Sequence, residues 1–87
     1  MHESGLVRSL VVRAAAIVEG AGTSPHRIGI RVGALSGVDP AVVRMYWERL
    51  AVTSLAGATL DIEVEATPDG PDSMGLVLTY VDVGEGG

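Results

Sequence analysis

The spacing of the apolar residues changes along this chain, and that change constrains the fold more than any other feature. In residues 6–18 they recur every three or four positions, which indicates a helix that buries Leu6, Leu10 and Ile17. In residues 26–35 they alternate with polar residues or glycine, which is typical of a strand with one buried face. Both periods within 87 residues predict helices packed on a sheet in one small domain.

A second helix is expected over residues 40–52. Asp39 is a preferred N-cap residue, and Pro40 is tolerated at the first helical position. The apolar stripe of this helix includes Tyr46 and Trp47, which at helical spacing are most simply core or interface residues.

Two strands should each bury one face. On the opposite face of residues 26–35 lie Gly29 and Gly33, whose missing side chains leave room for a close neighbour. In a second segment, after residue 57, aliphatic residues alternate with acidic residues, so one face of this strand is expected to be acidic and exposed to solvent. The inward residues of these two strands are Ile28, Ile30, Val32, Ala34, Leu60, Ile62 and Val64.

A third strand is predicted for residues 76–83. Its alternation slips between Leu78 and Val81, so a bulge near Thr79 and Tyr80 would keep both apolar side chains on the inner face.

The order of these elements predicts the architecture. The polar residues 66–75 contain turn-forming proline and glycine and should connect the second and third strands as an antiparallel hairpin. Helix, strand, helix, strand, strand indicates a two-layer α+β fold, a three-stranded mixed sheet with two helices on one face. We expect one domain over residues 1–87, with residues 84–87 as a flexible tail.

Composition excludes several classes of function. With 11 acidic residues against 6 arginines and no lysine, the net charge of −5 disfavours nucleic acid. The absence of lysine excludes lysine-dependent phosphate loops and Schiff-base chemistry. Ser36 lacks the flanking glycines of a nucleophile elbow. We therefore expect no enzyme. The absence of cysteine leaves the redox compartment undetermined. Without an apolar membrane span or a signal-peptide pattern, a soluble cytoplasmic protein is the expectation.

The first three residues form a compact set of candidate metal ligands. A metal could be chelated by the Met1 amine, the amide nitrogen and imidazole of His2, and a nitrogen or carboxylate oxygen of Glu3. Nitrogen-rich planar donors favour Ni(II) or Cu(II) over Zn(II), which prefers a tetrahedron. His26 follows a proline without other ligands nearby, which indicates an exposed turn residue.

Three segments together resemble one known family. They are Met1-His2-Glu3 followed at once by an amphipathic helix, Val-Gly-Ala-Leu-Ser-Gly-Val-Asp-Pro at residues 32–40, and Leu-Ala-Gly-Ala-Thr-Leu-Asp-Ile at residues 55–62. In this order and separation they resemble the HypA/HybF family of hydrogenase nickel-insertion chaperones. The resemblance covers nearly the whole chain.

The resemblance implies a non-enzymatic nickel metallochaperone that works with a maturation GTPase and delivers Ni(II) to the hydrogenase large subunit. Its metal residues correspond to Met1, His2 and Glu3, with Asp39 as an acidic group outside the ligand set. The family carries a zinc module with two Cys-x-x-Cys pairs between its last two strands, where this chain has only residues 66–75 and no cysteine. No structural zinc is therefore expected.

A second interpretation, from a different class, is a metal-free interaction module derived from the same family. Such a module would dock a partner, or a second copy as a homodimer, through its sheet edge or through the helix that contains Trp47. Loss of His2 separates the two interpretations, because docking should tolerate it.

Overall fold

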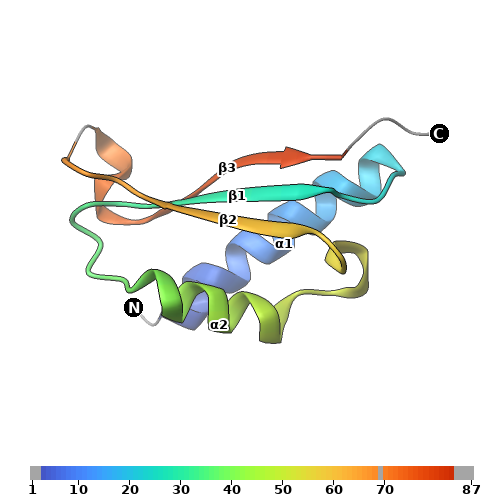
Figure 1. Ribbon diagram of the computed structural model, residues 1–87, viewed down its shortest axis with the longest axis horizontal. Coiled ribbons are helices and arrows are strands. Elements are labelled where there is room, and N and C mark those ends of the chain that lie inside the picture. The colour runs from blue at the N-terminus through green and yellow to red at the C-terminus, as the bar shows by residue number, and fades with distance from the viewer. Residues whose placement is uncertain (1–2, 69, 84–87) are drawn as a thin grey trace.

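The computed structural model describes residues 3–68 and 70–83. Figure 1 shows one sheet with both helices packed on the same side of it. The predicted α+β architecture and element order are confirmed. The elements are α1 (Glu3–Ala21), β1 (Arg27–Val32), α2 (Pro40–Leu50), η1 (Thr53–Leu55), β2 (Thr59–Val64), η2 (Pro71–Met74) and β3 (Leu76–Asp82), where η marks a short 3-10 helix.

Local signals set the ends of the two helices. α1 stops where Gly22 adopts a positive φ of 72° and donates its N–H to the Val18 carbonyl at 3.0 Å. At the start of α2 the Asp39 carboxylate accepts the Ala41 N–H at 2.8 Å, which confirms the predicted N-cap. α2 ends at Leu50, two residues before the predicted end, because the chain becomes extended at Ala51.

The strand order β2-β1-β3 corrects the predicted hairpin. β1 pairs in parallel with β2 and antiparallel with β3, so β3 does not pair with β2. Residues 65–75, which connect β2 to β3, exceed the roughly two to five residues of a tight hairpin loop and are long enough to pass to the far side of β1.

Charge and apolarity favour the central position of β1. Arg31 lies directly opposite Glu63 of β2, and Arg27 lies opposite Asp82 of β3 and bonds Asp61 of β2 at 3.2 Å. Opposite charges on neighbouring strands stabilise a pairing. The inward side chains of β1 are Ile28, Ile30 and Val32, which are at most 2% exposed.

The predicted bulge in β3 is confirmed. Gly29 is paired with Tyr80, whereas the next residue, Ile30, is paired with Leu78, so Thr79 is the extra residue. As a result Leu78 and Val81 both pack against the core.

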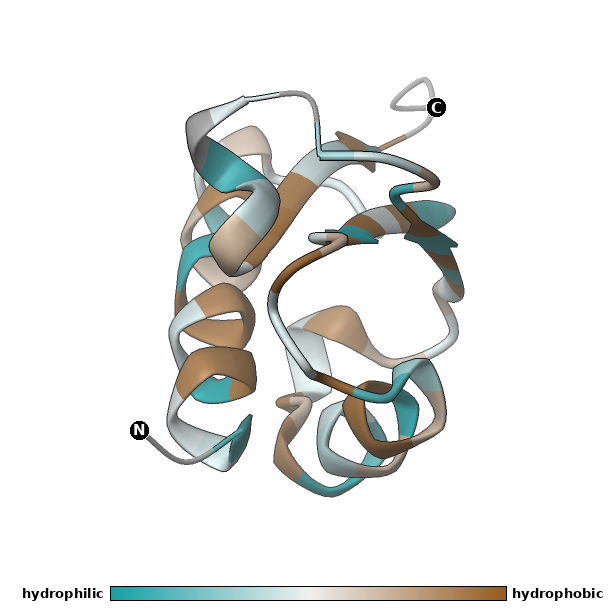
Figure 2. Ribbon diagram, turned by 90° about the vertical axis from the view of Figure 1, so that its left-hand side faces the viewer, coloured by the Kyte–Doolittle hydropathy of each residue, from teal (hydrophilic) through white to brown (hydrophobic). Residues whose placement is uncertain are grey.

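The core lies between the helix layer and the sheet. Figure 2 shows α1 beneath the β3 side of the sheet and α2 beneath the β2 side. Trp47 belongs to this core and is 5% exposed. The expected burial of Ile17 is wrong: it is 48% exposed, because it is turned about 100° around α1 from the buried Val18. Val64, expected to point inward, is 54% exposed at the end of β2.

Gly33 and Gly29 each permit a close contact, as their position on the outer face predicted. A Cβ atom at Gly33 would overlap the backbone carbonyl of Ser73 in η2, and one at Gly29 would overlap the ring of Tyr80. At Gly33 the contact is hydrogen-bonded: its N–H bonds the Gly75 carbonyl at 2.9 Å, and the Leu35 N–H bonds the Ser73 carbonyl at 2.8 Å.

We predict that Gly33→Ala lowers the free energy of unfolding by about 1–3 kcal/mol, because the methyl group would push η2 from β1. The matched control is Gly20→Ala within α1, where a Cβ meets nothing and should raise stability by about 0.5–1 kcal/mol. Urea unfolding followed by circular dichroism measures both. Equal stability of the Gly33→Ala variant and the parent would contradict the contact.

Candidate metal centre

Both helices begin at the same end of the molecule, which Figure 1 shows on the left. Glu3 is the first residue of α1 and is half-buried, and Asp39 caps α2. The strands β1 and β2 also end here. Of the predicted metal residues, Met1 and His2 lie outside the described residues, so the structure places Glu3 and Asp39 but not the proposed chelate itself.

A hydrogen-bonded loop over residues 33–39 brings Asp39 to this end. The Ser36 hydroxyl donates to the Gly33 carbonyl at 2.8 Å and accepts the Val38 N–H at 3.2 Å. Gly37 adopts a positive φ of 72°, a conformation that favours glycine. The segment Gly-Ala-Leu-Ser-Gly-Val, in which the family resemblance is concentrated, therefore has a structural role in this loop.

The same loop is tied to two other parts of the chain. The Ala34 N–H donates to the Glu65 carboxylate, just after β2, at 3.0 Å. The Leu35 N–H bonds Ser73 of η2, as described above. The loop that leads to α2 is thus held by Glu65, just after β2, and by Ser73 of η2, just before β3.

Helix polarity determines which ligands suit a cation at this end. The first turn of a helix carries partial positive charge, which disfavours a bound metal ion. Glu3 in the first turn of α1 and Asp39 at the cap of α2 supply compensating negative charge. Within residues 3–68 and 70–83, no three His, Cys, Asp or Glu side chains are grouped closely enough to bind a metal ion.

His26 immediately precedes β1, at the end of this strand remote from the 33–39 loop, and is exposed. Its backbone bonds Asp82 at 2.7 Å and Thr59 at 2.9 Å. This position agrees with the predicted exposed turn residue.

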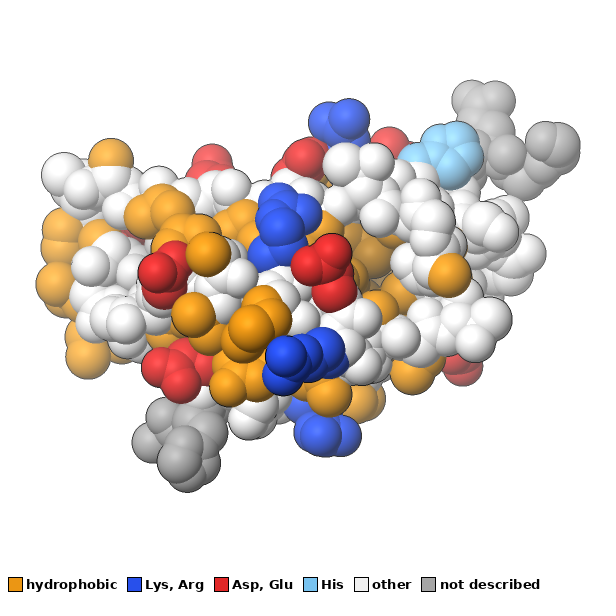
Figure 3. Space-filling model, turned by 60° about the horizontal axis from the view of Figure 1, so that its bottom comes forward, with side chains coloured by type: hydrophobic (Ala, Val, Ile, Leu, Met, Phe, Trp, Pro, Cys, Tyr) orange, Lys and Arg blue, Asp and Glu red, His pale blue; other side chains and the backbone are white. Residues whose placement is uncertain are grey.

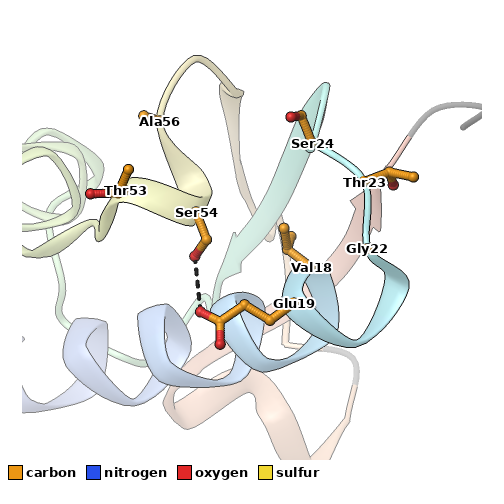
Figure 4. A pocket seen from close by; sticks show the side chains of 8 residues that line it. All are labelled: Val18, Glu19, Gly22, Thr23, Ser24, Thr53, Ser54 and Ala56. Carbon is orange, nitrogen blue, oxygen red and sulfur yellow. Dashed lines mark hydrogen bonds between the residues drawn. The ribbon is translucent and has the colours of Figure 1, made fainter. Parts of the chain in front are cut away.

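A pocket of about 310 Å³ lies between the end of α1 and η1 (Figure 4). Glu19 accepts a hydrogen bond from the Ser54 hydroxyl there at 3.2 Å. Its other lining residues are Val18, Gly22, Thr23, Ser24, Thr53 and Ala56, so it contains one carboxylate and no nitrogen ligand side chain. Glu19 is sixteen residues from Glu3, roughly 24 Å along α1, so this pocket is separate from the candidate metal end. Its one signal in the sequence is the presence of hydroxyl residues in two distant segments.

The outer face of the sheet holds a polar cluster, of which only the acidic side chains of β2 were expected from the alternation of residues. Asp61 accepts a hydrogen bond from the Tyr80 hydroxyl and pairs with Arg27, while Arg31 bonds Glu63 at 3.0 Å. The hydrogen bond to Asp61 raises the pKa of Tyr80, because ionising the phenol would lose the bond and place two anions together. Partial desolvation acts in the same direction.

The comparisons with known proteins agree with this architecture. The family described as "Hydrogenase/urease nickel incorporation, metallochaperone, hypA" matches residues 1–68. The solution structure of the Ni metallochaperone HypA from Helicobacter pylori is similar in fold, with a TM-score of 0.78 and 17% identity. That similarity covers 95% of this chain and 97% of the other. Comparison with curated proteins gives no significant match.

The family match places the chain among metallochaperones of nickel incorporation, which carry a metal and are not enzymes. The chain belongs to the HypA family. In the described part of the chain, no helix is long and apolar enough to cross a membrane.

We predict that Asp61→Asn lowers the pKa of Tyr80 toward the ordinary tyrosine value of about 10, because the neutral amide no longer repels the phenolate. Absorbance titration of tyrosinate in a Tyr46→Phe background isolates Tyr80, since these are the two tyrosines of the chain. A titration unchanged by Asp61→Asn would show that the hydrogen bond does not control this pKa.

Proposed function

We propose that this chain binds Ni(II) at Met1, His2 and Glu3 and delivers it for the maturation of a nickel–iron hydrogenase. The observation that supports this most directly is the extent of the family match, which begins at residue 1 and includes both this tripeptide and the 33–39 loop. The family description names hydrogenase and urease as destinations, and we propose the hydrogenase large subunit, with a maturation GTPase as the second partner.

The donor chemistry agrees with nickel. The amine of Met1, the backbone amide and imidazole of His2, and the amide or carboxylate of Glu3 are nitrogen-rich donors that can approach a plane around Ni(II). α1 anchors this end, because Val7, Leu10 and Val11, within two turns of Glu3, are at most 4% exposed. The nickel function is thus proposed for a single domain, with residues 66–75 in the place of the family's zinc module. The chain has no cysteine for a thiolate zinc site.

Asp39 acts in this proposal through charge and position rather than as a ligand. Its carboxylate already accepts the Ala41 N–H, and it stands at the end of the molecule where α1 begins. A negative charge there lowers the cost of bringing a cation close to two helix N-termini.

We predict that His2→Ala lowers Ni(II) affinity by at least about tenfold, because the imidazole and its chelate ring are lost. Extending the chain before Met1 should have a similar effect, since it removes the free amine. The matched control is His26→Ala, which removes the other histidine, at the far end of the sheet, and should leave affinity unchanged.

Isothermal titration of untagged protein measures these affinities. For the parent, affinity should fall as pH drops from about 8 to 6, because protons compete for the amine and the imidazole. Equal binding by the parent, His2→Ala and the extended form would exclude this site and favour the metal-free interaction module.

Two substitutions at Asp39 separate its capping role from its charge. Asparagine is also a good N-cap, so Asp39→Asn should keep the stability of α2 but weaken Ni(II) binding by roughly twofold to tenfold. Asp39→Ala should also lower the free energy of unfolding by about 1 kcal/mol. Nickel titration and urea unfolding of the same samples test this. If Asp39→Asn leaves the nickel affinity unchanged, the charge of Asp39 plays no part in metal binding and its role is only to cap α2.

A further inference from the structure

The C-terminal end of α1 carries negative charge that its own last turn does not balance. The last carbonyl groups of a helix have no partner within the helix and give this end a partial negative charge, which a basic side chain nearby often complements. The last turn of α1 contains no basic residue. It contains Glu19 instead, an exposed carboxylate that adds to the negative charge. This end of the helix therefore attracts a cation.

The pocket beside this helix end has walls that are held in place. Val18 of α1 is 4% exposed, and Leu55 of η1 is 2% exposed, so the core anchors both sides of the pocket. The Thr23 hydroxyl donates to the Val83 carbonyl at 3.0 Å, which fixes the turn after α1. The charge of the helix end thus faces a shaped cavity rather than a mobile segment.

The lining of the pocket suits a cation that donates several hydrogen bonds. One Glu19 oxygen accepts the Ser54 hydroxyl at 3.2 Å, and Figure 4 shows these two side chains pointing toward each other. A carboxylate has about four acceptor positions, so Glu19 can accept further hydrogen bonds. Hydroxyl groups of Ser24 and Thr53 also line the pocket. None of its lining residues is an arginine or a histidine, so the pocket supplies no cation of its own.

Among cations, a guanidinium group matches these acceptors better than a metal ion or an ammonium group. Calcium takes roughly six to eight oxygen ligands, whereas this pocket has one carboxylate. An ammonium is a compact and strongly hydrated point charge, whereas a guanidinium is planar, more weakly hydrated and presents its N–H donors in a rigid fork. The side chains of Val18 and Ala56 add apolar surface against which a methylene stem can pack.

Other acidic residues on the helix side already have cationic neighbours. Figure 3 shows basic and acidic side chains among the apolar ones over α2. Glu48 of α2 lies one helical turn after Arg44 and is followed by Arg49, and all three are exposed. Glu19 differs because its own helical turn contains no arginine.

We propose that this pocket binds the guanidinium group of an arginine side chain that a partner protein presents, with Glu19 as its counter-ion. Free small ligands are usually enclosed over most of their surface. Glu19, Ser24 and Thr53 are exposed, so the pocket is open and suits a side chain that its own protein holds in place. The pocket is far along α1 from Glu3, so a partner bound there leaves the candidate metal end accessible.

Nuclear magnetic resonance titration of the isotope-labelled, untagged full chain with a capped Gly-Arg-Gly peptide, without metal, tests the proposal. The amide signals of residues 22–24 and 53–56 should shift saturably, with a Kd on the order of millimolar. A capped Gly-Lys-Gly peptide should bind at least about threefold more weakly, because an ammonium lacks the planar fork. Free arginine, the second probe, should bind more weakly than the capped peptide, because Glu19 repels its carboxylate.

A matched pair of variants tests the counter-ion. Glu19→Gln should weaken binding of the arginine peptide by about tenfold, because it removes the charge and keeps the size of the side chain. The control is Glu48→Gln, which makes the same change at an exposed acid of α2 and should leave the Kd unchanged. Circular dichroism confirms that each variant is folded.

Four results would overturn the proposal. They are no saturable shift of these signals, equal binding of the arginine and lysine peptides, equal effects of Glu19→Gln and Glu48→Gln, and tighter binding of free arginine than of the capped peptide. The last result would assign the pocket to a small molecule. Because no metal is used, the outcome is independent of nickel binding at Met1, His2 and Glu3.

Discussion

The burial of β1 between β2 and β3 is the interaction on which the rest of this structure depends. Its inward face is Ile28, Ile30 and Val32, which the two helices cover, and its outward arginines are flanked by acidic residues of both neighbours. The C-terminal end of β1 leads directly into the loop that brings the start of α2 to the same end of the molecule as the start of α1. The strand with the most buried inner face thus shapes the candidate metal end, although the proposed ligands lie at the beginning of the chain, up to the first residue of α1.

One of the three segments that resemble the family, residues 32–40, contains this loop. Gly33 admits the Ser73 backbone, Ser36 bonds across the turn, and Gly37 adopts the left-handed conformation. The loop geometry thus explains why this segment resembles the family, and these side chains need no contact with a metal for that explanation. The nickel proposal depends instead on the tripeptide at the beginning of the chain, for which the loop and Asp39 provide the surroundings.

Local patterns predicted the elements because their causes are local. The cap of α2 follows from Asp39 and Pro40, and the slip in alternation between Leu78 and Val81 required the bulge at Thr79. The pairing of the last two strands was predicted wrongly, because a period of two defines a buried face but not a neighbour. The available signal was the arginines of β1, which match acidic residues of β2 and Asp82 of β3. The prediction that Ile17 is buried was wrong, because the apolar residues of α1 span a wider arc of the helix than the face that packs against the rest of the domain. The donor chemistry was readable at Met1-His2-Glu3, whereas the contacts of the 33–39 loop with Glu65 and Ser73 join residues about 30 to 40 positions apart.

The contact between Gly33 and η2 also determines where this domain can accept additional chain. Residues 73 and 75 form backbone hydrogen bonds with residues 35 and 33, respectively. An insertion between residues 73 and 75 would therefore shift the backbone that supports the 33–39 loop. Residues 66–68, in contrast, are exposed and precede η2. Extra residues there would leave both bonds in place. A domain with this geometry can therefore gain or lose a peripheral module between β2 and η2 while the end that holds the two helix starts keeps its shape.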